Sequence, residues 1–480
     1  MNYRYILKTL GKILCIEAFL LCFPLVINYI YQETNGLAFI ISIACILIIG
    51  VPLSLIRIKE KQIFIREGFV LVGLAWILLS LFGALPFVIS REIPHYIDAL
   101  FETVSGFTTT GASILIEVEN LSKGMLFWRS FTHWIGGMGV LVFVLAILPN
   151  SDGQNIYLLK AESTGPQVGK LVSKVRFTAR ILYLIYLGLT LIEFVMLLLG
   201  NNNWFESLLM SFGTAGTGGF GIYSDSVGSF NPYSQIVIAV FMMIFGINFN
   251  IFYLLLIRKV KSVLKSEELR WYLSIILIST VLIALNLITN LKQTAGVAFK
   301  DAYFQVSSII TTTGYSTVDF NLWPTFSKVI LVILMFVGGC AGSTGGGIKV
   351  SRIVIMFKTL GREIKKLLHP HSVNPIKMDG ETVDDEVVKG VTVYFGFIMI
   401  LLLGGTLLVS FDGLDFTTTF TGVVACLNNI GPGLNLVGPM GNFDCFSYFS
   451  KVLLSVLMLV GRLEIYPILI LFLPKTWSGK

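Results

Sequence analysis

The sequence predicts an all-α membrane protein in which a unit of helix, re-entrant segment and helix occurs four times, after two additional N-terminal transmembrane helices. Three observations predict this class. Hydrophobic residues make up 55% of the 480 residues and charged residues only 13%, which is not the composition of a soluble domain. The charges gather between apolar runs of about 20 residues, the length that crosses a bilayer. A Thr- and Gly-rich motif also returns at a spacing of about a hundred residues.

Ten apolar runs are long enough to be transmembrane helices. They are residues 10–30, 37–56, 69–90, 126–148, 177–199, 234–257, 271–288, 326–357, 391–410 and 446–473. The first run contains Glu17, lacks a small-x-small cleavage site and is followed at once by another apolar run. We therefore interpret it as a retained helix and not as a signal peptide.

Basic residues predict the orientation of the spans. Lys and Arg concentrate in segments 57–66, 160–176, 258–270 and 349–389, which all fall on one side when ten spans are counted. By the positive-inside rule this side is cytoplasmic, so both termini are expected in the cytoplasm. The net charge of +7 belongs to these segments beside the membrane lipid and does not indicate nucleic-acid binding.

The sequence shows no motif typical of an enzyme active site or a metal-binding site. The six cysteines are scattered, with no CxxC pair and no His/Cys cluster at metal spacing. The sequence offers no triad and no paired acids in a cavity, so we expect neither an enzyme nor a bound cofactor.

Four outward segments share one register. Segments 98–111 (DALFETVSGFTTTG) and 301–314 (DAYFQVSSIITTTG) both open with Asp-Ala-x-Phe and close with Thr-Thr-Thr-Gly. Segment 206–219 (ESLLMSFGTAGTGG) keeps the acidic start and the spacing, although its several glycines leave the register of the motif ambiguous. Segment 418–431 (TTFTGVVACLNNIG) keeps the spacing but lacks the acidic start.

Such segments are too short to span a bilayer and return only if their non-helical backbone is buried or lines a wet cavity. A short helix starting at Asp98, Glu206 or Asp301 would have an acid at its positive end and a carbonyl end that favours a cation. Thr-Thr-Gly then supplies successive carbonyls, which glycine can aim in one direction because it accepts a positive φ. One copy would indicate only a turn, whereas four copies predict a cation filter. The predicted filter residues are Thr109, Thr110, Gly111, Thr217, Gly218, Gly219, Thr312, Thr313, Gly314, Asn429, Ile430 and Gly431.

The chain resembles the TrkH/KtrB family of potassium transport subunits over nearly its whole length. The motifs that carry the resemblance are VSGFTTTGAS at 104–113, GTGGFG at 216–221, TTTGYSTVDF at 311–320, CLNNIGPGL at 426–434 and GRLEIYP at 461–467. The resemblance implies four membrane-pore-membrane repeats around one pseudo-fourfold pore in the bacterial cytoplasmic (inner) membrane. It also implies potassium as the substrate, bound only at a carbonyl filter, and a homodimer.

The two additional N-terminal spans resemble the TrkH branch of the family. Members of that branch work with TrkA, a cytoplasmic nucleotide-binding ring, so a separate TrkA-like regulatory subunit is expected here. We divide the chain into an N-terminal helix pair (1–60) and pore repeats at 61–150, 151–265, 266–375 and 376–480.

A glycine-rich interruption in the eighth span is the predicted gate loop (338–347). A helix cannot be expected to hold through six glycines in ten residues, and unwound backbone at this depth must line the cavity, where it would obstruct ions unless it moved. A phosphate-binding loop is not favoured, because Lys349 follows Ile348 and GxxxxGK[ST] is not met. The resemblance also implies a gate here. The gate residues are Gly338, Gly339, Gly342, Ser343, Thr344, Gly345, Gly346 and Gly347.

Arg462 lies inside the tenth span, where a guanidinium is costly unless it faces the pore or bonds to carbonyls. Its match to the family motif implies a place near the gate loop and an electrostatic barrier; the alternative is a structural clamp paired with Glu464.

For the whole chain, the alternative to a gated potassium pore is a proton- or sodium-coupled secondary transporter.

Overall fold

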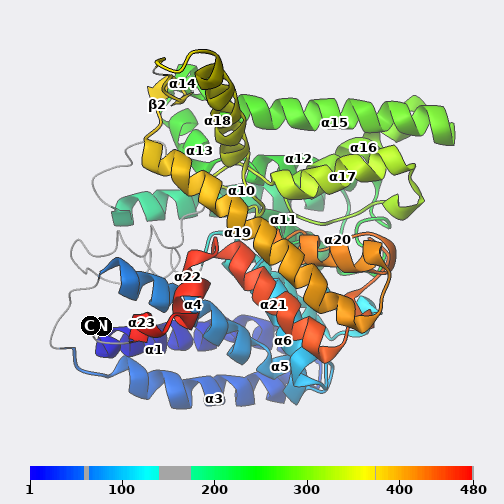
Figure 1. Ribbon diagram of the computed structural model, residues 1–480. Helices are drawn as coiled ribbons and strands as arrows, with labels where there is room; N and C mark the ends of the chain where they lie inside the picture. Colours follow the sequence, from blue (N-terminus) through cyan, green and yellow to red (C-terminus); the bar gives the residue numbers. More distant parts are fainter. Residues whose placement is uncertain (59–63, 140–174, 373, 478–480) are drawn as a thin grey trace.

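The computed structural model describes residues 1–58, 64–139, 175–372 and 374–477, and almost all of its regular structure is helical (Figure 1). The all-α class is thereby confirmed. Within the described residues the only strands are β1 (Lys377–Met378) and β2 (Glu381–Thr382). They form an antiparallel hairpin in which Lys377 is opposite Thr382.

The chain begins with three helices that pack against the first repeated unit. They are α1 (Tyr3–Leu20), α2 (Cys22–Ile30) and α3 (Gly36–Ser54). Helices α1 and α3 lie side by side, and Gly11 allows their close approach, because an added Cβ there would lie 2.5 Å from the Ser54 nitrogen. Helices α1 and α2 together make one candidate span (Tyr3–Ile30) and α3 makes the second (Gly36–Ser54), so two spans precede the first unit, as predicted.

Four units of helix, short helix and closing helix follow. The first contains α4 (Ile65–Gly83), α5 (Leu85–Ile89), α6 (Tyr96–Phe107), η1 (Val118–Asn120) and α7 (Lys123–Gly137). The second contains α10 (Val175–Leu199), α11 (Trp204–Gly216), α12 (Pro232–Phe245), α13 (Phe249–Leu256) and α14 (Val260–Lys265). The third contains α15 (Glu267–Leu291), α16 (Ala295–Ile310), η2 (Phe320–Leu322), α17 (Thr325–Val337) and α18 (Val350–Leu368). The fourth contains α19 (Asp385–Val409), η3 (Ser410–Asp412), α20 (Phe416–Leu427), η4 (Asn435–Val437), η5 (Phe443–Cys445), α21 (Tyr448–Arg462), α22 (Tyr466–Phe472) and α23 (Pro474–Trp477).

The units are joined in a closed order. The closing helix of each unit packs on the short helix of the next, through the pairs α7 with α11, α12 with α16, α17 with α20, and α21 with α6. The last pair returns to the first unit, and α22 also packs on α4. The four short helices are therefore arranged around one pseudo-fourfold axis, as the fold class predicted.

Two predicted spans are wrong in their continuity. The sixth is broken between α12 and α13, which meet at 91°. The tenth is broken between α21 and α22, where Glu464 and Ile465 have φ of 55° and 75°. Six continuous described helices are long and apolar enough to cross a membrane, or seven if the bent pair is one span.

Other predictions concern residues without a described position. The predicted repeat boundaries at 60/61 and 150/151, the end of the fourth span after residue 139 and the basic segment 160–174 lie outside the described residues. Helices α1 and α23 lie on the same side of the molecule (Figure 1), where the Tyr3 hydroxyl donates to the Trp477 carbonyl at 2.9 Å.

Candidate functional site

The four short helices end in the same backbone turn. A residue two before the final glycine has a left-handed conformation in each: Thr109, Thr217, Thr312 and Asn429 have φ of 54°, 53°, 60° and 55°. Left-handed φ costs a residue with a Cβ roughly 1–2 kcal/mol, and strain of this kind often collects at functional sites. The final residues Gly111, Gly219, Gly314 and Gly431 are also left-handed, with φ of 81°, 77°, 84° and 96°.

The same hydrogen bond closes each turn. The Thr110 N–H donates to the Ser105 carbonyl at 2.8 Å, which satisfies a carbonyl left free at the helix end. Its counterparts are Gly218 to Gly213 at 2.8 Å, Thr313 to Ser308 at 2.9 Å, and Ile430 to Ala425 at 2.9 Å. These bonds and the φ values place Gly219 in the register of the other three final glycines, which answers the ambiguity in the second unit.

The four final glycines lie in a ring of backbone contacts. An added Cβ on Gly111 would lie 2.1 Å from the carbonyl oxygen of Gly218 in the next unit. The same test places Gly219 at 1.8 Å from the Thr313 oxygen, Gly314 at 2.1 Å from the Ile430 oxygen, and Gly431 at 2.8 Å from the Thr110 oxygen. Each predicted filter segment (109–111, 217–219, 312–314 and 429–431) thus touches the next, and the fourth touches the first.

A cavity of about 120 Å³ opens on this ring. It is lined by all four final glycines, by Ser113 and Tyr223 in the chain that follows them, and by Arg129. The structure therefore brings the twelve predicted filter residues to one place, below a polar opening.

The acids at the starts of the short helices differ partly from expectation. Asp98 and Glu206 lie in the first turns of α6 and α11, as predicted. Helix α16 instead begins at Ala295, so Asp301 lies almost two turns inside it. The fourth unit does have an acid, because Asp415 is the N-cap of α20 and its carboxylate accepts from the Thr418 N–H at 3.0 Å. Hydrogen bonds from Thr418 hold the pKa of Asp415 below its usual value.

The predicted gate loop is an unwound segment between α17 and α18. Gly338, Gly342 and Gly347 have φ of 73°, 69° and 74°, which few other residues adopt. The two ends of the loop are joined, because the Val350 N–H donates to the Gly339 carbonyl at 3.1 Å. The loop is docked into the break between α12 and α13, since the Phe249 N–H donates to the Gly342 carbonyl at 3.1 Å.

The loop touches the inner ends of two filter segments. The Gly346 N–H donates to the Thr312 hydroxyl at 2.6 Å. An added Cβ on Gly346 would lie 2.5 Å from the Asn428 carbonyl oxygen, and one on Gly345 would lie 2.9 Å from that of Thr311. Backbone packs here without room for a methyl group.

Charged side chains hold the loop from three directions. Arg462 donates to the Thr344 carbonyl at 2.7 Å and to the carbonyls of Gly136 and Gly137 at 2.6 and 2.8 Å. Lys349 donates to the Gly345 carbonyl. The Glu268 carboxylate accepts from the Ala341 N–H at 2.7 Å and the Ser351 N–H at 3.2 Å. Arg462 thus bonds to carbonyls near the loop, while Glu464 forms a salt bridge with Arg352 at 2.5 Å.

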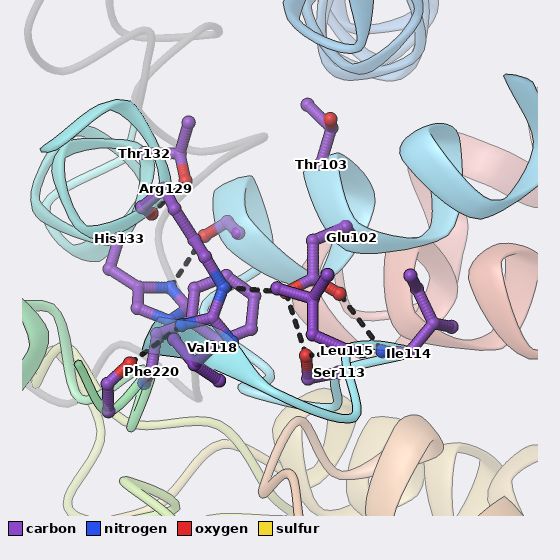
Figure 2. Close-up of polar contacts among 12 residues, drawn as sticks. Glu102, Thr103, Ser113, Ile114, Leu115, Val118, Arg129, Thr132, His133 and Phe220 are labelled. Carbon is purple, nitrogen blue, oxygen red and sulfur yellow. Dashed lines mark hydrogen bonds and ion pairs between the residues drawn. The ribbon is translucent and has the colours of Figure 1, made fainter. Parts of the chain in front are cut away.

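Sequence reasoning missed a buried polar group beside the first two filter segments. It consists of Glu102 from α6 with Arg129 and His133 from α7 (Figure 2). The only sequence signal was the presence of ionisable residues inside two apolar segments, which indicates a paired or functional group. No group of three or more His, Cys, Asp or Glu side chains suited to a metal ion occurs among the described residues.

Comparison with known proteins gives one family by three routes. The TrkH family model, described as a cation transport protein, matches residues 36–479. The Trk system potassium uptake protein TrkH of Escherichia coli (strain K12) is 36% identical over 484 residues, which are 99% of this chain and 100% of that protein. TrkG of the same strain is 33% identical over 95% of each chain. The crystal structure of the potassium transporter TrkH from Vibrio parahaemolyticus has a TM-score of 0.90, with 32% identity and 100% coverage of both chains.

Proposed function

This chain belongs to the TrkH family of cation transport proteins, and from that membership we propose that it takes up potassium across the bacterial cytoplasmic membrane. The family consists of transport proteins, so the chain is not an enzyme. The proposed path runs through a filter made by the backbone carbonyls of segments 109–111, 217–219, 312–314 and 429–431. Potassium is the substrate on this path, and the gate loop 338–347 controls its passage.

The observation that carries the proposal is the closed ring of four glycines. Each final glycine lies against a carbonyl oxygen of the next unit, with 1.8 to 2.8 Å between that oxygen and an added Cβ. Four segments in such contact present their carbonyls around one axis. A ring of carbonyls can replace the hydration shell of a monovalent cation. The alternating left-handed residues, such as Thr312 and Gly314, support carbonyls that point in one direction.

The position of the gate loop supports the proposal that the ion path is closed in this conformation. The loop lies against Thr311, Thr312 and Asn428 at the inner end of the filter segments. An ion leaving the filter would meet this backbone, so conduction requires the loop to move. We propose that Glu268, Lys349 and Arg462 stabilise the closed position.

Two partners complete the proposal. The relatives are named as components of a Trk system, which supports a regulatory partner. We propose that this partner is a separate cytoplasmic, nucleotide-binding TrkA-like subunit, and that the transport subunit is a homodimer. Two copies predict a protein mass of about twice 53.1 kDa in detergent, measured by light scattering.

The decisive experiment is potassium flux into liposomes that contain the purified protein, with sodium as competitor. We expect passive potassium flux in the wild type and sodium flux in Gly314→Ser, because a side chain at φ 84° would collide with the Ile430 carbonyl. Gly404→Ser is the matched control, since no atom lies within 4 Å of an added Cβ at that position of α19. Flux that requires a proton or sodium gradient and ignores Gly314→Ser would replace the proposal with the coupled transporter.

A further inference from the structure

We propose that Glu102, Arg129 and His133 form a clamp that sets the spacing between the first and second filter segments and so determines part of the cation selectivity. The inference rests on the proposed filter and adds positioning residues to it. All three side chains are at most 3% exposed, and none belongs to a filter segment. Figure 2 shows them between α6, α7 and the chain around Phe220.

Glu102 ties the first filter segment to its own short helix. Its carboxylate accepts from the Ser113 hydroxyl at 2.9 Å and from the Ile114 N–H at 3.0 Å. Both donors lie within three residues of Gly111, on the chain that leaves the filter. The same carboxylate accepts from the Arg129 Nε at 2.6 Å, so its charge is paired.

Arg129 carries the connection across to the second unit. Its Nη1 donates to the Gly221 carbonyl at 2.8 Å, two residues beyond Gly219. The guanidinium also lies 3.6 Å from the centre of the Phe220 ring, a favourable cation–π contact. One rigid, planar group therefore joins the segments that follow Gly111 and Gly219.

His133 makes a second connection between the same two units, one helical turn from Arg129. Its Nδ1 lies 2.8 Å from the Gly106 carbonyl, and its Nε2 lies 3.2 Å from the Phe220 backbone nitrogen. The Phe220 N–H can only donate, so Nε2 accepts and the proton is on Nδ1. The ring is then a neutral spacer of fixed length, and it fills the place of a Gly218 side chain, whose Cβ would lie 2.2 Å from the His133 Cγ.

A charged residue occurs at the Glu102 position in only the first of the four units. Nine residues before the final glycine, where the first unit has Glu102, the other units have Met210, Gln305 and Gly422. At the second junction a neutral contact is found instead, with the Tyr315 hydroxyl donating to the Phe220 carbonyl at 3.3 Å. We therefore expect selectivity to depend more on this ion pair than on the residues at the same position of the other three units.

The test compares Glu102→Gln and Arg129→Lys with wild type in planar bilayers, using the potassium-to-sodium permeability ratio and the melting temperature. Glu102→Gln leaves the guanidinium unneutralised beside the outer cavity. Arg129→Lys keeps the charge near Glu102, but its single nitrogen cannot hold both Glu102 and the Gly221 carbonyl. Each variant is expected to lower the permeability ratio about tenfold, the effect of losing one or two buried hydrogen bonds.

Glu92→Gln is the matched control. It makes the same chemical change on the outer side, where Glu92 accepts from the Ser122 N–H at 2.9 Å at the start of α7, and it should keep the wild-type ratio. His133→Gln keeps every charge in place and should also lower the ratio, which covers the case in which Glu102→Gln does not fold. Wild-type permeability ratios in Arg129→Lys and His133→Gln, with only a lower melting temperature, would overturn the clamp. Absence of passive potassium current in the wild type would instead refute the proposed function.

Discussion

At the scale of single residues, the four final glycines share one backbone conformation but differ in how closely a carbonyl oxygen of the next unit approaches them. The clearance from an added Cβ to the facing carbonyl oxygen is 1.8 Å at Gly219, 2.1 Å at Gly111 and Gly314, and 2.8 Å at Gly431. All four have left-handed φ, so the backbone cost of a side chain is similar, roughly 1–2 kcal/mol. The steric cost is what separates them.

We therefore predict a graded response to alanine. Gly219→Ala should reduce the potassium-to-sodium permeability ratio most, Gly111→Ala and Gly314→Ala should follow, and Gly431→Ala should reduce it least. Bilayer recordings of the four variants under one ionic gradient measure this order. Equal effects at all four positions, or the largest effect at Gly431, would show that close contact does not govern the selectivity.

Arg462 allows a test of charge against hydrogen bonding. Its guanidinium reaches Thr344 in the gate loop and Gly136 and Gly137 at the end of α7, which one ammonium nitrogen cannot do together. We predict that Arg462→Lys and Arg462→Gln both raise potassium flux several-fold, since each lost hydrogen bond is worth about 1 kcal/mol. Liposome flux is the measurement, with Arg362→Gln, in the half-exposed later part of α18, as the control. If Arg462→Lys behaves like wild type while Arg462→Gln leaks, the residue acts through its charge as a barrier.

At the scale of elements, the gate loop depends on the start of α15. Glu268 accepts hydrogen bonds from both sides of the loop, at Ala341 and Ser351. The preceding residue, Glu267, pairs with Lys358 of α18 at 2.6 Å, and its N–H donates to Asp379 of the β1–β2 hairpin at 2.5 Å. The β1–β2 hairpin, α18 and the gate loop thus meet at two consecutive residues.

Glu268→Gln should therefore loosen the closed loop. Hydrogen bonds to a charged acceptor are worth about 1 kcal/mol more than those to a neutral one, so the open fraction should rise about fivefold. Potassium flux in liposomes without any added regulatory subunit measures the change. Glu267→Gln is the control, and equal flux in both variants and the wild type would contradict a role of Glu268 in holding the loop.

The elements were predictable where a repeated pattern marked them. Four segments in one register located the short helices and the turns that end them, and six glycines located the unwound loop between α17 and α18. The breaks at Gly246 and Glu464 were not predicted, because α21 contains no proline, the proline of α12 is its first residue (Pro232), and the apolar patterns run on. Helix α16 begins earlier than expected because Thr294 precedes a helix-compatible run, and Asp415 was overlooked because it lies three residues before Thr418.

At the scale of the whole molecule, most of what joins the units was hidden from the sequence. The Glu102–Arg129–His133 clamp and the anchors of the gate loop link residues that are tens to hundreds of positions apart. With one sequence, the presence of buried charges indicates that partners exist but does not identify them. The closed order of the units, in contrast, followed from the regular spacing of the motif.

Cys445 provides a test of orientation. It lies in η5, on the exposed chain between the fourth filter segment and α21, so it should face the outside of the cell. Partial burial raises the pKa of its thiol above the usual value, and the charge of Asp444 adds to the increase. A membrane-impermeant maleimide should label intact cells at this residue, and the labelling rate should rise with pH over a more alkaline range than for an ordinary thiol, because the thiolate is the nucleophile. Cys445→Ser is the control, and labelling only after permeabilisation would invert the predicted orientation.

The contact between Gly431 and Thr110 also fixes when the filter can exist during biosynthesis. These residues close the ring, although more than three hundred positions separate them along the chain. The ribosome makes the first three units before residue 431 is available, and domains emerge in order from the N-terminus. Until the fourth unit has been inserted, the nascent protein has three sides of a filter and no enclosed axis. Along the proposed path, a half-made chain should therefore not let ions leak across the membrane, because translation of the last quarter is needed to close the ring.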